Sequence, residues 1–243
     1  MELSYSGTKY HGWQSQPNAE TVQDNIEKAL SILLKYPTKI IGAGRTDTGV
    51  HAKQMFAHFD SDSKISCASL QQKLNAFLAK DIAIFKIHPV VETAHARFDA
   101  VARSYTYYIH QQKDPFQQDF SWLLYKELDI PLMQSAAKSL LFFEDFKSFS
   151  KTHTDVKTYL CDIQKIEWVE KNKALQFNIT ADRFLRNMVR AIVGTLINVG
   201  LHKITLDEFI EIVKARDRQK AGFSVPAHAL FLTKIDYPKN IFI

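Results

Sequence analysis

The sequence predicts an α+β fold: two ferredoxin-like (split βαβ) halves joined into one central, mainly antiparallel sheet flanked by helices. Three observations lead to this prediction. The first hundred residues show periodicities in the order strand, helix, strand, strand, helix, strand, and longer elements then repeat much of that order. The chain has 243 residues, enough for one large or two small domains. Its 46% hydrophobic and 23% charged residues are typical of a globular protein.

The elements of the first half follow from local patterns. Thr21 and Asp24 have the spacing of a capping box, and Val22, Ile26 and Leu30 then recur at helical intervals. This predicts a helix over residues 21–35. The remaining elements predicted here are strands at 39–42, 54–59 and 82–87 and a helix at 70–78.

The second half contains longer elements. Thr205 and Glu208 form another capping-box pattern, which predicts a helix after residue 205. The other predicted elements are strands near 105–109, 159–169, 174–180 and 229–235 and helices at 133–141 and 182–199. We place the boundary between the halves near residue 100. Residues 1–100 then carry a glycine-rich loop, and residues 101–243 carry a tyrosine-rich strand and an arginine-rich helix.

Charge and cysteine content narrow the classes of function. The formal charge is +5 and the pI is near 9.0, which favours a polyanionic partner such as nucleic acid. The two cysteines, Cys67 and Cys161, lie far apart in sequence, so neither a zinc site nor a disulfide framework is expected. The sequence lacks a signal-peptide pattern, and its longest apolar stretch, residues 191–201, is too short to span a bilayer. A cytoplasmic protein with no metal and no membrane partner is therefore expected.

Residues 42–52, GAGRTDTGVHA, are the first candidate site. Three glycines surround Asp47, and Arg45, His51 and Lys53 are its cationic neighbours. We expect the glycines to permit positive φ and a close approach to a ligand. A carboxylate beside arginine stays ionised, which suits a nucleophile or a fixed negative charge. The alternatives are an ordinary surface turn and a phosphate-binding loop, although the phosphate-loop spacing is absent.

Two clusters in the second half are further candidates. If residues 182–199 are helical, Arg183, Arg186 and Arg190 share one face. That face could bind an RNA backbone, or one arginine could reach an active-site carboxylate; a solvated basic face is the alternative. In the strand near 105–109, Tyr105 could stack on a flipped base, whereas core packing is the usual role of a strand aromatic.

Together and in this order, the motifs resemble the TruA family of tRNA pseudouridine synthases over nearly the whole chain. The matching runs are YSGT (5–8), HGWQ (11–14), TVQ (21–23), GAGRTD (42–47), LNA (74–76), HARF (95–98), RSY (103–105), FLRNMVR (184–190) and IVG (192–194). The resemblance implies that Asp47 is the essential aspartate, that Arg190 pairs with it, and that Tyr105 contacts the target uridine. It also implies that Arg45 holds the RNA with its base turned out. Arg186, Lys53 and His51 are added as candidate substrate-binding residues.

The resemblance further implies uridine isomerisation at positions 38–40 of tRNA, by a homodimer that needs no cofactor or metal. Isomerisation gains and loses no atoms, and one carboxylate suffices, whereas a hydrolytic glycosidase normally uses two. Asp47 could attack C1′, stabilise its charge or remove the C2′ proton, and the sequence leaves these routes open. The alternatives are a non-catalytic tRNA-binding or tRNA-folding protein, a uracil-releasing glycosidase, and a synthase acting on other RNA uridines.

Overall fold

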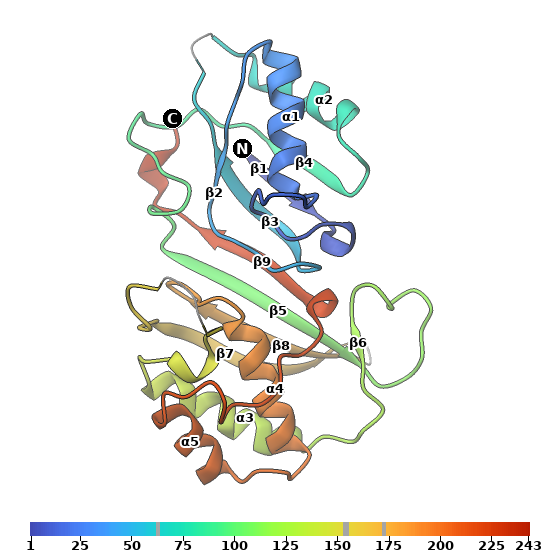
Figure 1. Ribbon diagram of the computed structural model, residues 1–243, viewed down its shortest axis with the longest axis vertical. Coiled ribbons are helices and arrows are strands. Elements are labelled where there is room, and N and C mark those ends of the chain that lie inside the picture. The colour runs from blue at the N-terminus through green and yellow to red at the C-terminus, as the bar shows by residue number, and fades with distance from the viewer. Residues whose placement is uncertain (62–63, 153–155, 172–173) are drawn as a thin grey trace. The chain divides into compact units, whose positions relative to one another are not determined.

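The computed structural model describes residues 1–61, 64–152, 156–171 and 174–243, and these form two compact units (Figure 1). The first unit comprises Met1–Val101 together with Phe231–Ile243, and the second comprises Ala102–Leu230. The C-terminal segment therefore belongs to the same compact unit as the first hundred residues.

The first unit is built on strands β1 (Glu2–Tyr5), β2 (Ile41–Gly42), β3 (His51–His58), β4 (Ile82–Lys86) and β9 (Leu230–Asp236). Their order is β4-β1-β3-β9, and β2 pairs with β3. Strand β1 runs antiparallel to both β3 and β4, whereas β9 runs parallel to β3. The chain therefore returns from the second unit to lie beside β3, the strand that directly follows the glycine-rich loop.

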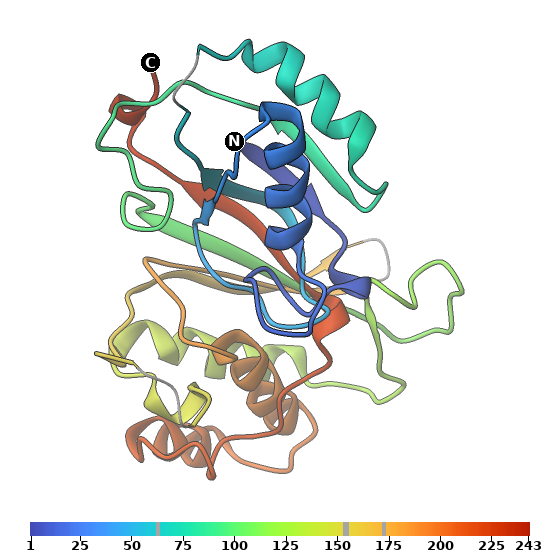
Figure 2. The same cartoon turned by 45° about the horizontal axis from the view of Figure 1, so that its top comes forward.

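Helices α1 (Val22–Leu34) and α2 (Cys67–Phe77) pack together, and α1 crosses in front of the first unit's strands (Figures 1 and 2). The Thr21 hydroxyl accepts a hydrogen bond from the Asp24 amide at 3.2 Å, as the capping-box pattern predicted. Val22, Ile26 and Leu30 are fully buried. The predicted order strand, helix, strand, strand, helix, strand is thus confirmed.

The second unit contains strands β5 (Ala102–His110), β6 (Trp122–Leu123), β7 (Ile163–Lys171) and β8 (Ala174–Ala181). Strand β8 lies between β5 and β7 and is antiparallel to both, and β6 is parallel to β5. Its helices are α3 (Ile130–Ser139), α4 (Met188–Gly200) and α5 (Leu206–Lys214). Short 3₁₀ turns lie at Gly7–Lys9, Leu140–Phe142, Lys147–Phe149, Ala227–Ala229 and Lys239–Ile241.

Both units combine mainly antiparallel strands with helices, which confirms the predicted α+β class. In the second unit, α4 is buried around almost its whole circumference, and α3 and α5 both pack against it. Within the described parts of the chain, no helix is both long and apolar enough to cross a membrane.

The helix predicted over 182–199 begins later, at Met188. Asn187, just before it, has a left-handed φ of 66°, which interrupts helical geometry. The Asp182 carboxylate accepts the amides of Asp162 and Arg183, so this stretch makes bonds outside a helix. The prediction that three arginines share one helical face is therefore wrong, because Arg183 and Arg186 precede the helix and only Arg190 lies on it.

Candidate active site

The Asp47 loop connects β2 to β3, and its three glycines have different roles. Of these three glycines, only Gly49 adopts the positive φ that glycine permits, at 78°. A Cβ on Gly42 would lie 2.3 Å from Nε1 of Trp13, so Gly42 is required for packing. A Cβ on Gly44 would meet no atom within 4 Å. The loop therefore has open space beside Gly44, three residues before Asp47.

Residues 5–12 of the N-terminal segment pack against the backbone of the Asp47 loop. Gly12 has φ of 91°, and a Cβ there would lie 2.3 Å from the Thr46 carbonyl oxygen. A Cβ on Gly7 would lie 2.1 Å from the carbonyl oxygen of Val50. The Tyr5 hydroxyl lies 2.9 Å from the Thr46 hydroxyl. These close approaches fix the backbone on both sides of Asp47, which is itself half-buried.

His51 and Lys53 both contact the ring of Phe231. His51 is buried and stacks on Phe231, with ring centroids 4.5 Å apart. Its Nδ1 accepts the Gly7 amide at 3.0 Å. The Lys53 ammonium lies 5.2 Å from the centre of the same Phe231 ring, and its side chain is exposed. His51 therefore ties β9 and the N-terminal segment to the end of the Asp47 loop.

In the second unit, Arg190 is held by an irregular segment that follows α5. Its Nε donates to the Val225 carbonyl oxygen at 2.8 Å, and the Val225 amide donates to the Arg190 carbonyl oxygen at 3.3 Å. Asn187, one turn earlier, donates its side-chain amide to the Ser224 hydroxyl at 2.6 Å. Because Nε is engaged by the protein, the guanidinium plane has a defined orientation.

Arg218 organises the segment that holds Arg190. Its guanidinium donates to the carbonyl oxygens of Ala221 and Gly222, at 3.4 and 3.0 Å, and to the Ser224 hydroxyl at 3.0 Å. A Cβ on Gly222 would lie 2.9 Å from the backbone of Gly194 and Thr195 in α4, so the segment packs tightly on that helix. Sequence reasoning missed Arg218, because no pattern links it to Arg190.

The tyrosines of β5 have two distinct environments. Tyr107 is fully buried, and its hydroxyl donates to the Pro226 carbonyl oxygen at 3.0 Å. Burial raises the pKa of Tyr107, so it stays protonated as a core residue. Tyr105 is half-buried and meets Phe184 edge to face, with centroids 5.1 Å apart. Of the two, Tyr105 therefore keeps the accessible ring.

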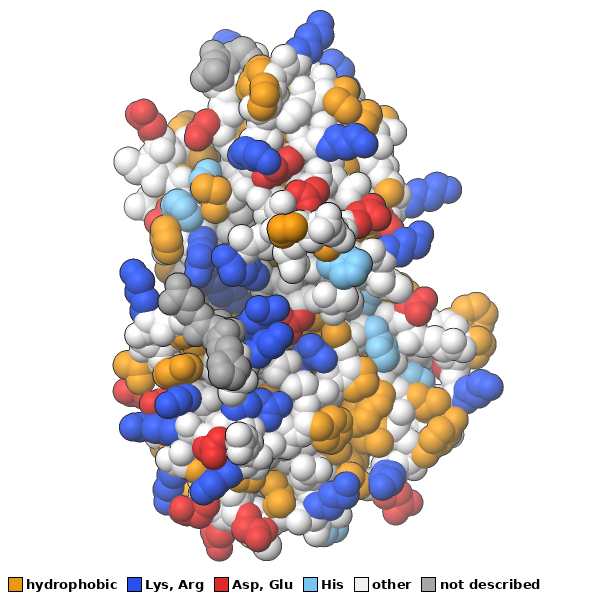
Figure 3. Space-filling model, viewed as in Figure 1, with side chains coloured by type: hydrophobic (Ala, Val, Ile, Leu, Met, Phe, Trp, Pro, Cys, Tyr) orange, Lys and Arg blue, Asp and Glu red, His pale blue; other side chains and the backbone are white. Residues whose placement is uncertain are grey.

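The remaining predicted arginines lie toward solvent. Arg45 and Arg186 are exposed, and Arg183 is half-buried. The backbone carbonyl of Arg186 accepts the Lys151 amide at 3.0 Å, which anchors the turn before α4. Many lysine and arginine side chains cover the face drawn in Figure 3, in agreement with the basic pI.

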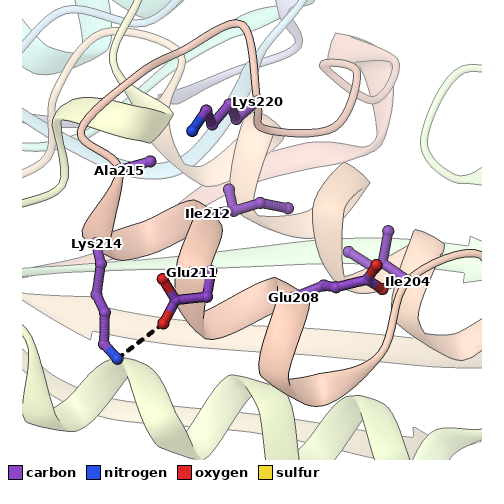
Figure 4. A pocket seen from close by; sticks show the side chains of 7 residues that line it. All are labelled: Ile204, Glu208, Glu211, Ile212, Lys214, Ala215 and Lys220. Atoms are coloured by element: carbon purple, nitrogen blue, oxygen red, sulfur yellow. Dashed lines mark hydrogen bonds and ion pairs between the residues drawn. The ribbon is translucent and has the colours of Figure 1, made fainter.

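A hollow and a buried thiol in the second unit lie apart from the predicted site residues. A hollow of about 510 Å³ beside α5 is lined by Ile204, Glu208, Glu211, Ile212, Lys214, Ala215 and Lys220 (Figure 4). Glu211 and Lys214 pair within it at 2.9 Å, and none of the predicted site residues lines it.

Burial raises the pKa of Cys161 to about 12, which makes its thiol a poor nucleophile. Among the described residues, no His, Cys, Asp and Glu side chains gather as a metal site.

Comparison with known proteins defines the class of protein to which these features belong. A sequence profile of the tRNA pseudouridine synthases matches residues 3–99 and 136–238, a span that includes Asp47 and Arg190. The chain therefore belongs to the tRNA pseudouridine synthase family.

Individual relatives narrow this assignment. The chain is 53% identical to tRNA pseudouridine synthase A of Parabacteroides distasonis, over 99% of this chain and 96% of that protein. It is 49% identical to tRNA pseudouridine synthase A of Porphyromonas gingivalis, over 99% and 97%. It is 38% identical to the protein of that name from Bacillus subtilis, over 97% of both chains.

Proposed function

We propose that this protein isomerises uridine to pseudouridine in the anticodon stem-loop of tRNA, at positions 38–40. The observation that carries the proposal is the Asp47 loop. A half-buried carboxylate lies on irregular backbone fixed by Gly7 and Gly12, and open space remains beside Gly44. Fixed backbone with free space is the arrangement that a reacting carboxylate requires for a positioned substrate.

We assign Asp47 as the residue that acts on the ribose and Arg190 as the arginine that the family resemblance pairs with it. Tyr105 would stack on the target uracil, which its accessible ring permits. Arg45, Arg186 and Lys53 are exposed and would contact the RNA backbone or the space left by the flipped base. Because His51 is buried against Phe231, its part in substrate binding would be indirect, through the loop it supports.

The chemistry follows from the change in charge at C1′. As the N1–C1′ bond breaks, C1′ becomes electron-poor, and an adjacent carboxylate can attack it, stabilise it or remove the C2′ proton. The uracil then turns, and C5 bonds to C1′, so no other reactant is needed. The target base must first leave its stack, which costs a few kcal/mol that contacts to the phosphates can offset.

We extend the proposal to the assembly and location of the protein. Family resemblance supports a homodimer that binds tRNA across both subunits in the cytoplasm. Light scattering of the purified protein would test the dimer, since a monomer at assay concentrations would refute it.

The function is tested with Asp47→Ala and the exposed control Asp60→Ala. Both proteins are incubated with tRNA carrying [5-³H]uridine, and tritium release and pseudouridine are measured. Wild type and Asp60→Ala should release tritium at the same rate, whereas Asp47→Ala should release none above background. Mapping the pseudouridines tests positions 38–40, and modification confined to other RNAs would refute the proposed substrate.

The alternative functions give different results in this assay. A tRNA-binding or tRNA-folding protein would leave RNA composition unchanged even in the wild-type form. A glycosidase would release free uracil. The single carboxylate in the loop argues against the glycosidase, because hydrolysis normally also needs a general acid.

A further inference from the structure

The chain segment between β4 and β5 (Figure 1) carries an exposed aromatic ring in the first unit. Phe98 is 75% exposed, and the His95 ring stacks on it with centroids 4.2 Å apart and an interplanar angle of 28°. The guanidinium carbon of Arg97 lies 5.8 Å from the centre of the Phe98 ring. We call His95, Arg97 and Phe98 the 95–98 platform.

The backbone of this platform is tightly hydrogen-bonded. Nδ1 of His95 accepts the amides of Arg97 and Phe98, at 3.1 and 3.2 Å. The Asp99 amide donates to the His95 carbonyl oxygen at 3.1 Å, and the Asp99 carboxylate accepts the His95 amide at 2.7 Å. The turn is therefore closed by its own side chains, and it presents Phe98 outward in a fixed position.

Neighbouring elements anchor the same turn to the sheet. The Ala96 amide donates to Nδ1 of His58, at the end of β3, at 3.0 Å. The Tyr237 hydroxyl, just after β9, donates to the Ala96 carbonyl oxygen. A single exposed apolar side chain is common on protein surfaces and does not by itself indicate a binding site. A ring braced by two elements and a stacked histidine is preorganised, and preorganisation lowers the cost of binding.

The composition of the platform favours a nucleobase as its ligand. Proteins bind unpaired nucleotides by stacking bases on aromatic rings, with arginine beside the ring to meet the phosphate. A protein partner would instead favour a contiguous apolar patch. The residues that contact the Phe98 ring are instead a histidine, His95, and an arginine, Arg97. This polar composition fits a nucleobase better than an apolar protein surface.

The platform lies far from the Asp47 loop within the same unit. The loop leads into β3 at His51, and the platform is attached at His58, the opposite end of that strand. Eight extended residues separate these ends by about 24 Å. The platform therefore cannot touch the reacting uridine and would contact a different nucleotide.

We propose that Phe98, stacked on His95, binds an unpaired base of the bound tRNA outside the active site, and that Arg97 meets the adjacent phosphate. This inference rests on the proposed function, which makes tRNA the substrate. A contact remote from the reacting atoms stabilises the ground state and the transition state equally. Its loss therefore raises KM and leaves kcat unchanged.

The test compares Phe98→Leu, Phe98→Trp and the control Phe142→Leu, since Phe142 is 88% exposed but lies in the second unit. The dissociation constant for tRNA is measured by filter binding, kcat and KM by tritium release, and folding by thermal melting. Phe98→Leu should weaken binding about tenfold, equivalent to about 1.4 kcal/mol. Its kcat and melting temperature should not change. Phe98→Trp should bind as wild type, because tryptophan also stacks, and so should Phe142→Leu.

Other outcomes separate this inference from the proposed function. If Phe98→Leu binds tRNA as tightly as wild type while wild type forms pseudouridine, the proposed role of Phe98 in tRNA binding is refuted. The proposed isomerisation of uridine is then unaffected. A change in oligomeric state on Phe98→Leu, with unchanged binding per subunit, would also refute it in favour of a protein contact. If wild type forms no pseudouridine, the proposed function fails, and the binding series still decides whether Phe98 contacts RNA.

Discussion

Single residues set the shape of the Asp47 loop through backbone contacts. Gly12 contributes no side-chain chemistry, yet its positive φ and its approach to Thr46 determine where the loop can lie. Gly44 lies in the same loop and has neither constraint. Two glycines near one carboxylate therefore have different physical roles, and the sequence alone does not distinguish them.

Gly12→Ala should destabilise the protein by about 1–3 kcal/mol, because the new Cβ meets a carbonyl oxygen and φ is unfavourable for alanine. Gly44→Ala is the matched control and should change the free energy of unfolding by less than about 0.5 kcal/mol. Urea denaturation of both variants measures this difference. Equal stabilities would contradict the described packing of the loop.

His58 should make stability depend on pH. Burial, and secondarily the neighbouring His95, lower the pKa of His58 below its ordinary value of 6.5, and Asp60 and Asp99 partly oppose this. The unfolded chain therefore binds more protons than the folded protein as pH falls below 6.5. The stability contribution is present above that pH and is lost as pH falls through the lowered pKa.

His58→Gln provides the comparison, because glutamine can accept the Ala96 amide without titrating. Thermal melting between pH 5 and 8 should show that wild type loses more stability than the variant on acidification. If the melting temperatures of wild type and His58→Gln change equally with pH across this range, His58 does not contribute to the pH dependence of stability.

At the scale of elements, α4 and the segment 217–226 act together. The helix supplies Arg190, and the segment engages its Nε through Val225. Arg218 joins three points of that segment with one guanidinium. We infer that Arg218 is a positioning residue for Arg190.

Arg218→Ala should lower kcat about 10- to 100-fold while leaving tRNA affinity unchanged, because small displacements of a catalytic group are costly. Arg218→Lys should have a kcat close to that of Arg218→Ala, since lysine lacks the planar guanidinium that donates to several acceptors at once. The control is Arg216→Ala, which removes an exposed side chain paired with Asp145 at 3.0 Å. Single-turnover kinetics and filter binding separate the two effects, and equal kcat values for both alanine variants would refute the inference.

Helix α5 depends on its capping box. The Thr205 hydroxyl accepts the Glu208 amide at 3.2 Å, and the Glu208 carboxylate accepts the Thr205 amide at 2.7 Å. Thr205→Ala should cost about 1 kcal/mol of stability. The rate of tritium release under native conditions should not change, since α5 carries no proposed site residue. A melting temperature equal to that of wild type would contradict the cap's contribution.

At the scale of the whole molecule, the excess of basic residues should govern affinity for RNA. The logarithm of tRNA affinity should fall linearly with the logarithm of salt concentration, because phosphate contacts release counterions. Arg45→Gln and Arg186→Gln should each make this negative slope shallower by about one if the two arginines contact phosphates. Lys214→Gln, which removes a cation paired with Glu211, should leave the slope unchanged.

The sequence by itself determined the α+β class, the element order of the first unit, both helix caps and the family. These features depend on local spacing: a cap needs a hydroxyl three residues before an amide, and helix and strand have different periods. The family motifs likewise identified Asp47 within the glycine-rich loop.

Only the tertiary structure decided the features that depend on distant partners. The start of α4 at Met188 follows from bonds between Asp182 and Asp162, which compete with helical hydrogen bonds. The buried position of His51 depends on β9 returning to pair with β3. The link between Arg218 and Arg190 and the anchoring of the 95–98 platform by His58 and Tyr237 have the same origin. Such contacts join residues far apart in sequence, and local periodicity contains no information about them.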